Sequence, residues 1–214
     1  MNINLEILSS AYIYDEKQIE NLHTKELVPK MITRRRLTRA SKIVIDLAHG
    51  VEFNDGRIVY GSSFGELNAT AHILNSIAQK EPISPTHFQN SVYNTAVSYL
   101  SMLKGNTNEI MTISNDDKTS LNVLQAGAIK ALDGDILLLI VTETLNIDKI
   151  EEVNECIDFL ECGVALKVRV TQEQETLDLN DLRTNLKLPD AIQHMMYIAQ
   201  NMSSTTSNIV KIQL

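Results

Sequence analysis

The chain has 214 residues, of which 43% are hydrophobic and 21% are charged, a composition typical of a soluble globular protein with a real core. Its formal net charge of −8 argues against a non-specific nucleic-acid binder, because such proteins need surplus lysine and arginine to neutralise phosphates. No apolar run is long enough to span a bilayer, and the first residues lack the basic and apolar regions of a signal peptide. We therefore expect a cytoplasmic protein without a membrane span.

The chain contains no linker, low-complexity tract or internal repeat, so residues 1–214 are predicted to form a single domain. Its two cysteines, Cys156 and Cys162, make neither a disulfide framework nor a metal-binding pattern. We expect both to be reduced and buried, and we expect no metal and no diffusible cofactor.

The first half of the chain alternates between strand and helix patterns. Ile3, Leu5 and Ile7 alternate with polar residues and predict a strand. Apolar residues at helical spacing predict a helix over 37–47, with Gly50 as its C-cap. A short strand at 57–60 and a helix at 67–78 follow, in the order expected of an α/β domain.

The segment from Phe88 to Leu103 predicts one helix. It contains no Asp, Glu, Lys or Arg over four turns, which is typical of a helix that is buried on all sides. The pattern therefore indicates a buried central helix, with Phe88 either in the core or at a functional surface.

The second half of the chain continues the alternation and then changes character. Residues 160–170 alternate between apolar and polar side chains over a long stretch, which predicts a half-exposed antiparallel strand. The remaining predicted elements are a strand at 109–114, a helix at 117–132 capped by Asp116 or Asp117, a strand at 136–142, a helical region at 180–202 and a final strand at 209–214. These elements predict a layered α/β fold with a mixed sheet.

The run from Ser84 to Asn94 resembles the segment that opens the central helix of β-ketoacyl synthases. In that family a strand and a helix start follow, and the helix start carries the nucleophilic cysteine. Counted without gaps through Gly105, the cysteine position falls on Asp117 here. The resemblance thus implies a ketosynthase relative whose nucleophile is missing.

Two further segments, 31–38 and 61–67, add to the likeness. With the Ser84–Asn94 run they resemble the short ketosynthase-like proteins of aryl polyene and related pigment clusters. The match covers about residues 30–145, and Tyr93 departs from it because histidine is usual there. It implies half of a thiolase-like fold, whose sheet would expose apolar surface unless it is paired or covered by residues 150–214.

The resemblance also implies a non-catalytic role. Ketosynthases complete their site with two histidines and a lysine from a second half-domain, and we expect none of them in this chain, whose five histidines do not match those motifs. Chain-length factors, the inactive partners of ketosynthases, often have glutamine at the cysteine position, where this chain has Asp117. We therefore expect a chain-length-factor-like subunit of a type II polyketide or aryl polyene system, with a full-length ketosynthase as partner and an acyl carrier protein as a further one.

The family fold suggests where these partners would bind. Thiolase-like proteins dimerise through an edge strand, which corresponds here to Ile110, Met111, Thr112 and Ile113. The segment before the central helix would reach the partner's acyl tunnel and limit chain length through Thr86, His87 and Phe88. A basic run would either dock the acidic carrier protein or form a solvated helix start, and consists of Arg34, Arg35 and Arg36.

Two other readings stay open from the sequence. Gly61–Gly65 satisfies G-x-S-x-G between a strand and a helix, which would make Ser63 the nucleophile of an esterase. His194 would be its base, oriented by Asp135 or Asp190, although too few strands precede Gly61 for a hydrolase sheet. The third reading is a stand-alone interaction protein with no link to acyl chains.

Overall fold

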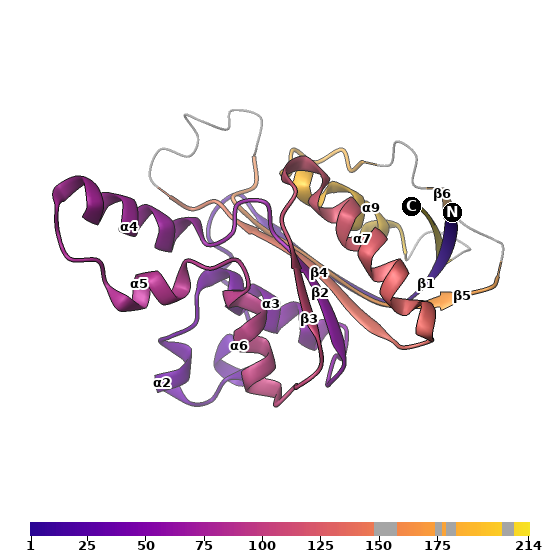
Figure 1. Cartoon of the computed structure of the whole chain (residues 1–214), viewed down its shortest axis with the longest axis horizontal. Helices are drawn as coiled ribbons and strands as arrows, with labels where there is room; N and C mark the ends of the chain where they lie inside the picture. Colours follow the sequence, from indigo (N-terminus) through magenta and orange to yellow (C-terminus); the bar gives the residue numbers. More distant parts are fainter. Residues whose placement is uncertain (148–157, 174–176, 179–182, 203–207) are drawn as a thin grey trace.

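In the computed structural model, the residues described are 1–147, 158–173, 177–178, 183–202 and 208–214. They form a mixed sheet in the order β3-β2-β4-β5-β1-β7-β6 (Figure 1). The strands are β1 (Asn2–Asp15), β2 (Arg57–Gly61), β3 (Ile110–Ile113), β4 (Leu137–Thr144), β5 (Glu161–Thr171), β6 (Leu177–Asp178) and β7 (Ile209–Gln213).

The sheet combines a parallel and an antiparallel part. β2 pairs in parallel with β3 on one side and with β4 on the other, through helical crossovers. β5 then runs antiparallel between β4 and β1, and β7 pairs antiparallel with β1. The predicted α/β class with a mixed sheet is confirmed, as is the antiparallel direction of the strand at 160–170.

Helices cover both faces of this sheet. They are α1 (Thr24–Leu27), α2 (Met31–Arg34), α3 (Arg39–Gly50), α4 (Leu67–Gln79), α5 (Pro85–Asn90), α6 (Thr95–Lys104), α7 (Thr119–Lys130) and α9 (Gln193–Asn201), with short 3₁₀ turns η1 (Asp116–Lys118), η2 (Ala131–Asp133) and η3 (Asp190–Ile192). α3 and α6 pack on one face, and α7 and α9 pack on the other (Figure 1).

β4 shows why the two layers form. Its odd-numbered residues Leu137, Leu139 and Val141 join the cluster under α7 and α9, while Leu138 and Ile140 join the cluster under α3 and α6. All eight residues of the strand are buried. A strand covered on both faces has no solvent side, so residues 137–141 are continuously apolar rather than alternating.

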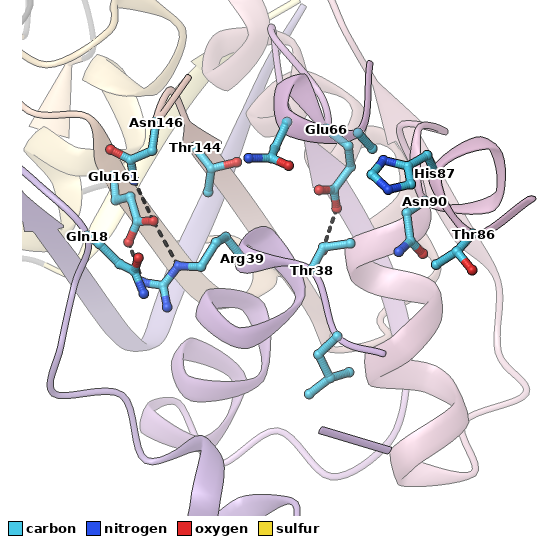
Figure 2. A pocket seen from close by; sticks show the side chains of 13 residues that line it. Gln18, Thr38, Arg39, Glu66, Thr86, His87, Asn90, Thr144, Asn146 and Glu161 are labelled. Atoms are coloured by element: carbon cyan, nitrogen blue, oxygen red, sulfur yellow. Dashed lines mark hydrogen bonds and ion pairs between the residues drawn. The ribbon is translucent and has the colours of Figure 1, made fainter. Parts of the chain in front are cut away.

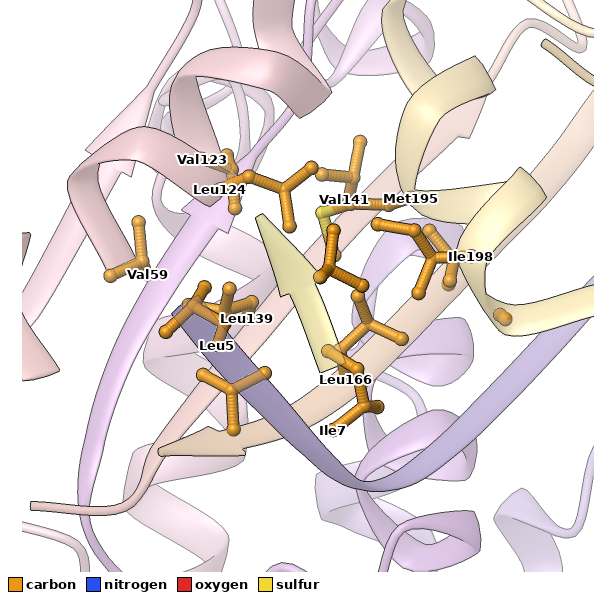
Figure 3. Close-up of a cluster of buried hydrophobic side chains, with 14 of the residues drawn as sticks. Leu5, Ile7, Val59, Val123, Leu124, Leu139, Val141, Leu166, Met195 and Ile198 are labelled. Carbon is orange, nitrogen blue, oxygen red and sulfur yellow. The ribbon is translucent and has the colours of Figure 1, made fainter. Parts of the chain in front are cut away.

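The C-terminal segment supplies part of this cover. Met195 and Ile198 of α9 lie in the same buried cluster as Leu5 and Leu166, on the face that α7 also covers (Figure 3). This face of the sheet is therefore covered within the chain, by residues beyond 183.

The predicted helix over 88–103 is wrong in two respects. The segment forms two separate helices, α5 and α6, and α6 buries only one face, from Thr95 to Ser101. Phe88 is 67% exposed and Met102 is 66% exposed. The lack of charge misled the prediction, because a helix of uncharged polar and apolar residues can still have a solvent face.

The half-exposed character predicted for residues 160–170 is also wrong at its start. Glu161 to Leu166 are all buried, and only the end of β5, around Arg169, is exposed. Glycine and alanine, which alternate with the apolar residues, lie under α3: a Cβ at Gly163 would meet Ile43 Cγ2 at 2.7 Å. The small residues are thus a packing requirement rather than a solvent face.

Three local predictions differ in detail. Neither Asp116 nor Asp117 caps α7: the N-cap is Lys118, without a side-chain hydrogen bond, and Asp116 adopts a φ of 45°. Gly50 is the last residue of α3 rather than its cap. α9 begins only at Gln193, later than the helical region predicted from 180.

The cysteine and membrane predictions have simple outcomes. Cys162 is a free, buried thiol, and burial raises its pKa well above the ordinary value. Cys156 lies outside the described residues. Within the described ranges, no helix has the length and apolarity needed to cross a membrane.

Candidate functional site at the carboxyl ends of the parallel strands

The carboxyl ends of the parallel strands β2, β3 and β4 all lie on the same side of the sheet, and sites in open α/β sheets form beyond such strand ends. The chain after β2 contacts the chain after β3 there, because Ser114 Oγ donates a hydrogen bond to Ser63 O at 3.3 Å. This side of the sheet also carries three buried carboxylates, which organise the site.

Glu143 holds the turn that follows β2. Its side chain accepts hydrogen bonds from Ser62 Oγ at 3.0 Å, from Phe64 N at 3.2 Å and from Ser63 N. The residue is fully buried, and burial raises the pKa of its carboxyl to about 7 against the pull of these donors. The G-x-S-x-G turn is therefore fixed by a carboxylate beneath it.

A cavity of about 310 Å³ opens beside this turn, between α3, α4 and α5 (Figure 2). Glu66, at the start of α4, lines it and is only 6% exposed. Thr38 Oγ1 donates to Glu66 Oε1 at 2.6 Å, yet burial still raises the pKa of Glu66 to about 7. We call this space the strand-end cavity.

The opposite wall of the strand-end cavity is a buried ion pair. Arg39 Nε donates to Glu161 Oε1 at 2.8 Å, and Arg39 Nη2 reaches the other carboxylate oxygen. Asn146 Nδ2 and the backbone N of Ile19 also donate to Glu161, at 2.6 and 2.8 Å. Glu161 is fully buried, so these donors replace the water that its charge would otherwise need.

Two of the three predicted tunnel residues face this cavity. Thr86 and His87 both line it from α5, and the His87 ring packs edge-on against His72 of α4, with ring centroids 4.4 Å apart. Phe88 does not line it and is 67% exposed, so the core alternative for Phe88 is wrong.

The predicted interface strand lies at the edge of the sheet. β3 is hydrogen-bonded to β2 on one side, and no described strand pairs with its other side. Met111 is 36% exposed, and Ile110, Thr112 and Ile113 are half-buried. This position is what the interface prediction requires, although pairing itself stays a prediction.

The remaining predicted residues are scattered. Asp117 is exposed in η1, between β3 and α7, and does not line the strand-end cavity. Arg34 is turned inward, where its Nη1 donates to the backbone oxygens of Val28 and Pro29, at 2.7 and 2.5 Å. The other two arginines of the basic run, Arg35 and Arg36, are both exposed.

The structure does not assemble an esterase triad. No hydrogen bond joins Ser63 to His194 in the part of the chain that the structure describes. Asp135 pairs with Arg57 at 3.1 Å. Arg57 is the first residue of β2, so this pair lies at the amino end of the strand, whereas Ser63 follows its carboxyl end. Asp190 accepts a hydrogen bond from Arg183 instead of orienting a catalytic histidine.

No site for a metal is evident among the described residues, which contain no group of three or more potential His, Cys, Asp or Glu ligands. The sequence did not predict Glu66, Glu143 or Glu161 as site residues. One signal was available for Glu143, because an acidic residue within a strand that begins with five apolar residues is expected to be buried with hydrogen-bond partners. The partners themselves come from distant segments and carry no local signal.

Comparison with known proteins connects this architecture to a family. The sequence model of the β-ketoacyl synthase N-terminal domain matches residues 11–212. The chain belongs to this family. No curated protein matches its sequence.

Solved ketosynthase structures share the fold. A chain from the complex of the ketosynthase ApeO with its chain length factor ApeC, from Xenorhabdus doucetiae, is 21% identical with a TM-score of 0.69, and the match covers 91% of this chain and 92% of that one. The ishigamide ketosynthase/chain length factor is 10% identical, with a TM-score of 0.62 and coverage of 80% and 63%. AntDE:AntF, a type II polyketide synthase carrier protein in complex with its ketosynthase, is 12% identical, with a TM-score of 0.62 and coverage of 80% and 64%.

These coverages show two size classes. This chain and the matched chain of the ApeO–ApeC complex are nearly equal in length, while the chain spans under two thirds of the other two structures. At such identities the likeness shows the thiolase-like fold of ketosynthase domains, and it shows that the domain resembles proteins that include chain length factors.

Proposed function

We propose that this protein is a non-catalytic, chain-length-factor-like subunit that pairs with a full-length ketosynthase in type II polyketide or aryl polyene biosynthesis. The observation that carries the proposal is the near-complete match to a chain of a ketosynthase–chain length factor complex, combined with an aspartate at the position predicted for the nucleophilic cysteine. A cysteine thiolate is the nucleophile that attacks an acyl thioester, and an aspartate at that place does not replace it.

The pairing surface in this proposal is the free edge of β3. Ile58 N donates to Glu109 O and Ser62 N donates to Ile113 O, so the odd-numbered residues of β3 direct their backbone groups toward β2. The alternate residues, Ile110 and Thr112, direct theirs to the free edge. An incoming strand of the ketosynthase would satisfy these groups and extend the sheet across the dimer.

The length-setting element in this proposal is α5. Phe88 projects a large apolar side chain into solvent from the helix that also places Thr86 and His87 at the strand-end cavity. Ile83, Val92 and Tyr93, close to Phe88 in the sequence, are exposed as well, and a group of exposed apolar side chains favours a protein interface. At the partner's tunnel, Phe88 would close the end of a pocket that the growing acyl chain fills.

Carrier docking, if it uses the basic run, falls to Arg35 and Arg36. Both reach solvent and can meet an acidic carrier protein, while the Arg34 side chain donates to the backbone oxygens of Val28 and Pro29. Charge complementarity of this kind mainly raises the rate of encounter.

Co-expression with a full-length ketosynthase from the same gene cluster tests the proposal. We expect a one-to-one complex by size-exclusion chromatography with light scattering. Thr112→Pro removes an outward N–H of β3 and should abolish the complex, while Thr112→Val keeps that N–H and should preserve it. Two separate species with the unsubstituted chain, or a self-associated chain that ignores the ketosynthase, would instead support a stand-alone interaction protein.

Product length tests the role of α5 within an assembled complex. Phe88→Ala should lengthen the acyl product if Phe88 closes the tunnel, and the complex should still form. If the complex forms and the product length is unchanged, Phe88 does not set chain length, and the proposed pairing with the ketosynthase is unaffected.

A further inference from the structure

The basic residues near α3 divide into two groups. Arg35 and Arg36 point toward solvent, whereas Arg34 and Lys42 turn toward a second cavity, of about 480 Å³, between the segment 18–25 and helices α2 and α3. We call it the basic cavity, and its polar lining residues include Glu20, Thr24, Lys25, Arg34, Arg39 and Lys42. Four cationic side chains around one cavity are unexpected in a chain with a net charge of −8.

The two lysines lack an ion-pair partner. Arg39 is neutralised by Glu161, and Arg34 donates to the backbone oxygens of Val28 and Pro29. Neither Lys25 nor Lys42 forms an ion pair within the described ranges. Glu20 is the one acidic residue among the described lining residues, so the lining carries a surplus of positive charge.

Lys42 is the more constrained of the two lysines. It is half-buried on α3, and its pKa is lowered first by burial and then by the charge of Arg39. Asp46, one turn further along the same helix, is engaged by the backbone N and the Nδ1 of His23. The charge of Glu161 acts in the opposite direction but does not restore the pKa, so Lys42 bears a desolvation cost that the described chain offsets only in part.

Thr24 gives an independent indication. Its Oγ1 is buried without a hydrogen-bond partner, and the residue is 9% exposed while lining the basic cavity. A buried polar atom without a partner costs about 1–3 kcal/mol, so such atoms generally meet a ligand or water. Thr24 shares the lining of the basic cavity with Lys25 and Lys42, and a hydroxyl and two ammonium groups are together suited to an oxygen-rich anion.

We propose that the basic cavity binds a phosphate group, as inorganic phosphate or as the terminal group of a small phosphate ester. Three lining side chains left without an ion pair or hydrogen bond in the described chain, those of Thr24 and Lys25 of α1 and Lys42 of α3, come from two helices. A phosphate group has enough acceptor oxygens for all three, whereas a carboxylate has two. The described lining holds no aromatic side chain on which a nucleobase would stack. The proposal is independent of the pairing with a ketosynthase, since the purified chain alone suffices for the test.

Isothermal titration calorimetry of the full chain with inorganic phosphate tests the site. We expect saturable binding that sulfate matches only in part and chloride does not match. Lys42→Ala and Lys25→Ala should each weaken phosphate binding at least about tenfold, because each removes a charge-assisted hydrogen bond. Lys104→Ala removes an exposed lysine at the end of α6, and should leave the affinity unchanged.

Thr24→Val separates binding from folding. Valine has nearly the shape of threonine and removes the unpartnered hydroxyl, so the Tm of the phosphate-free protein should stay the same or rise. The rise in Tm that phosphate produces should shrink in this variant. A misfolded variant would have a lower Tm without phosphate. A smaller rise in Tm with phosphate, at an unchanged or higher Tm without it, therefore reports a loss of binding.

Titration with 4′-phosphopantetheine distinguishes the source of the phosphate. Tighter binding than inorganic phosphate indicates an ester as the ligand, and weaker binding indicates the free anion. The proposal is overturned if phosphate produces no saturable heat, if chloride acts equally well, or if Lys104→Ala weakens binding as much as Lys42→Ala.

Discussion

The sheet buries its apolar side chains, whereas the α4–α5 segment exposes several of its own. In β4 all eight residues are buried, whereas α4 buries only Ala69 among its thirteen residues. Leu74, Ile77 and Phe88 are 60%, 58% and 67% exposed. Figure 1 shows α4 and α5 projecting away from the layers that α3, α6, α7 and α9 form on the sheet.

This difference teaches that an apolar helix face predicts a contact, but not whether the same chain or another protein provides the contacting surface. The spacing of Leu67, Ala71, Leu74 and Ala78 is as regular as that of any helix on the sheet. Yet in the described chain only Leu67 and Ala71 are half-buried, while Leu74 and Ala78 are exposed, so the outer part of this face is free to meet another protein. Substitutions should therefore cost stability in the sheet layers and cost association in the α4–α5 segment.

The largest stability effect is expected at Arg39, on the sheet side of the strand-end cavity. Arg39→Ala leaves the fully buried Glu161 carboxylate without its cation, which should lower the free energy of unfolding by about 3–5 kcal/mol. Urea denaturation measures it. Arg169→Ala breaks an exposed pair with Glu6 and should cost no more than about 1 kcal/mol, so equal losses in the two variants would contradict the contrast.

Leu139→Ala should lower the free energy of unfolding by about 2–5 kcal/mol, because it opens a cavity in the packed layer under α7. The chain offers a specific rescue. A Cβ at Gly127 would lie 2.5 Å from Leu139 Cδ2, so Gly127→Ala clashes by itself but fits where Leu139 has been shortened. A double-mutant cycle should show a favourable coupling, and simple additivity would argue against this contact.

The pH dependence of the free energy of unfolding should come from the buried carboxyl groups of Glu143 and Glu66. The folded-state pKa values of Glu143 and Glu66 are about 7, above the ordinary 4.5, so the folded chain holds these protons more tightly than the unfolded chain. The free energy of unfolding should therefore fall as pH rises from about 4.5 to about 7, by at most about 3 kcal/mol for each group.

Glu143→Gln removes one of these titrations and should flatten the fall between those pH values. Glu16→Gln alters an exposed carboxylate and should leave the slope unchanged. Urea denaturation at several pH values compares the three proteins. A slope that survives in Glu143→Gln at full size would assign the dependence to other groups.

The smallest stability effect is expected in the α4–α5 segment. Ile77→Ser should change the free energy of unfolding of the isolated chain by no more than about 0.5 kcal/mol, because the side chain is already exposed. The same substitution should weaken association with a ketosynthase if α4 meets that partner. A loss of several kcal/mol in the isolated chain would mean that α4 is covered in solution by this chain itself.

Much of the fold could be predicted from the sequence because strands and helices leave periodic signals. Ile3, Leu5 and Ile7 correctly predicted β1, and the apolar run after Asp135 correctly predicted β4. The ends of elements were less predictable, because Asp116 adopts a positive φ and α7 starts without a side-chain cap. The site was the least predictable part, since Glu143 finds its donors about eighty residues earlier in the chain.

The sequence by itself determined the α/β class, the order of the elements, the place of the candidate interface strand and the aspartate at the predicted nucleophile position, because each depends on local periodicity or on a run of residues. Only the tertiary structure decided that Phe88 is exposed, that Glu66 and Glu161 line one cavity, and that Lys25 and Lys42 line another. The reason is physical. Burial and charge compensation depend on which distant segments pack together, and no single stretch of chain records its neighbours.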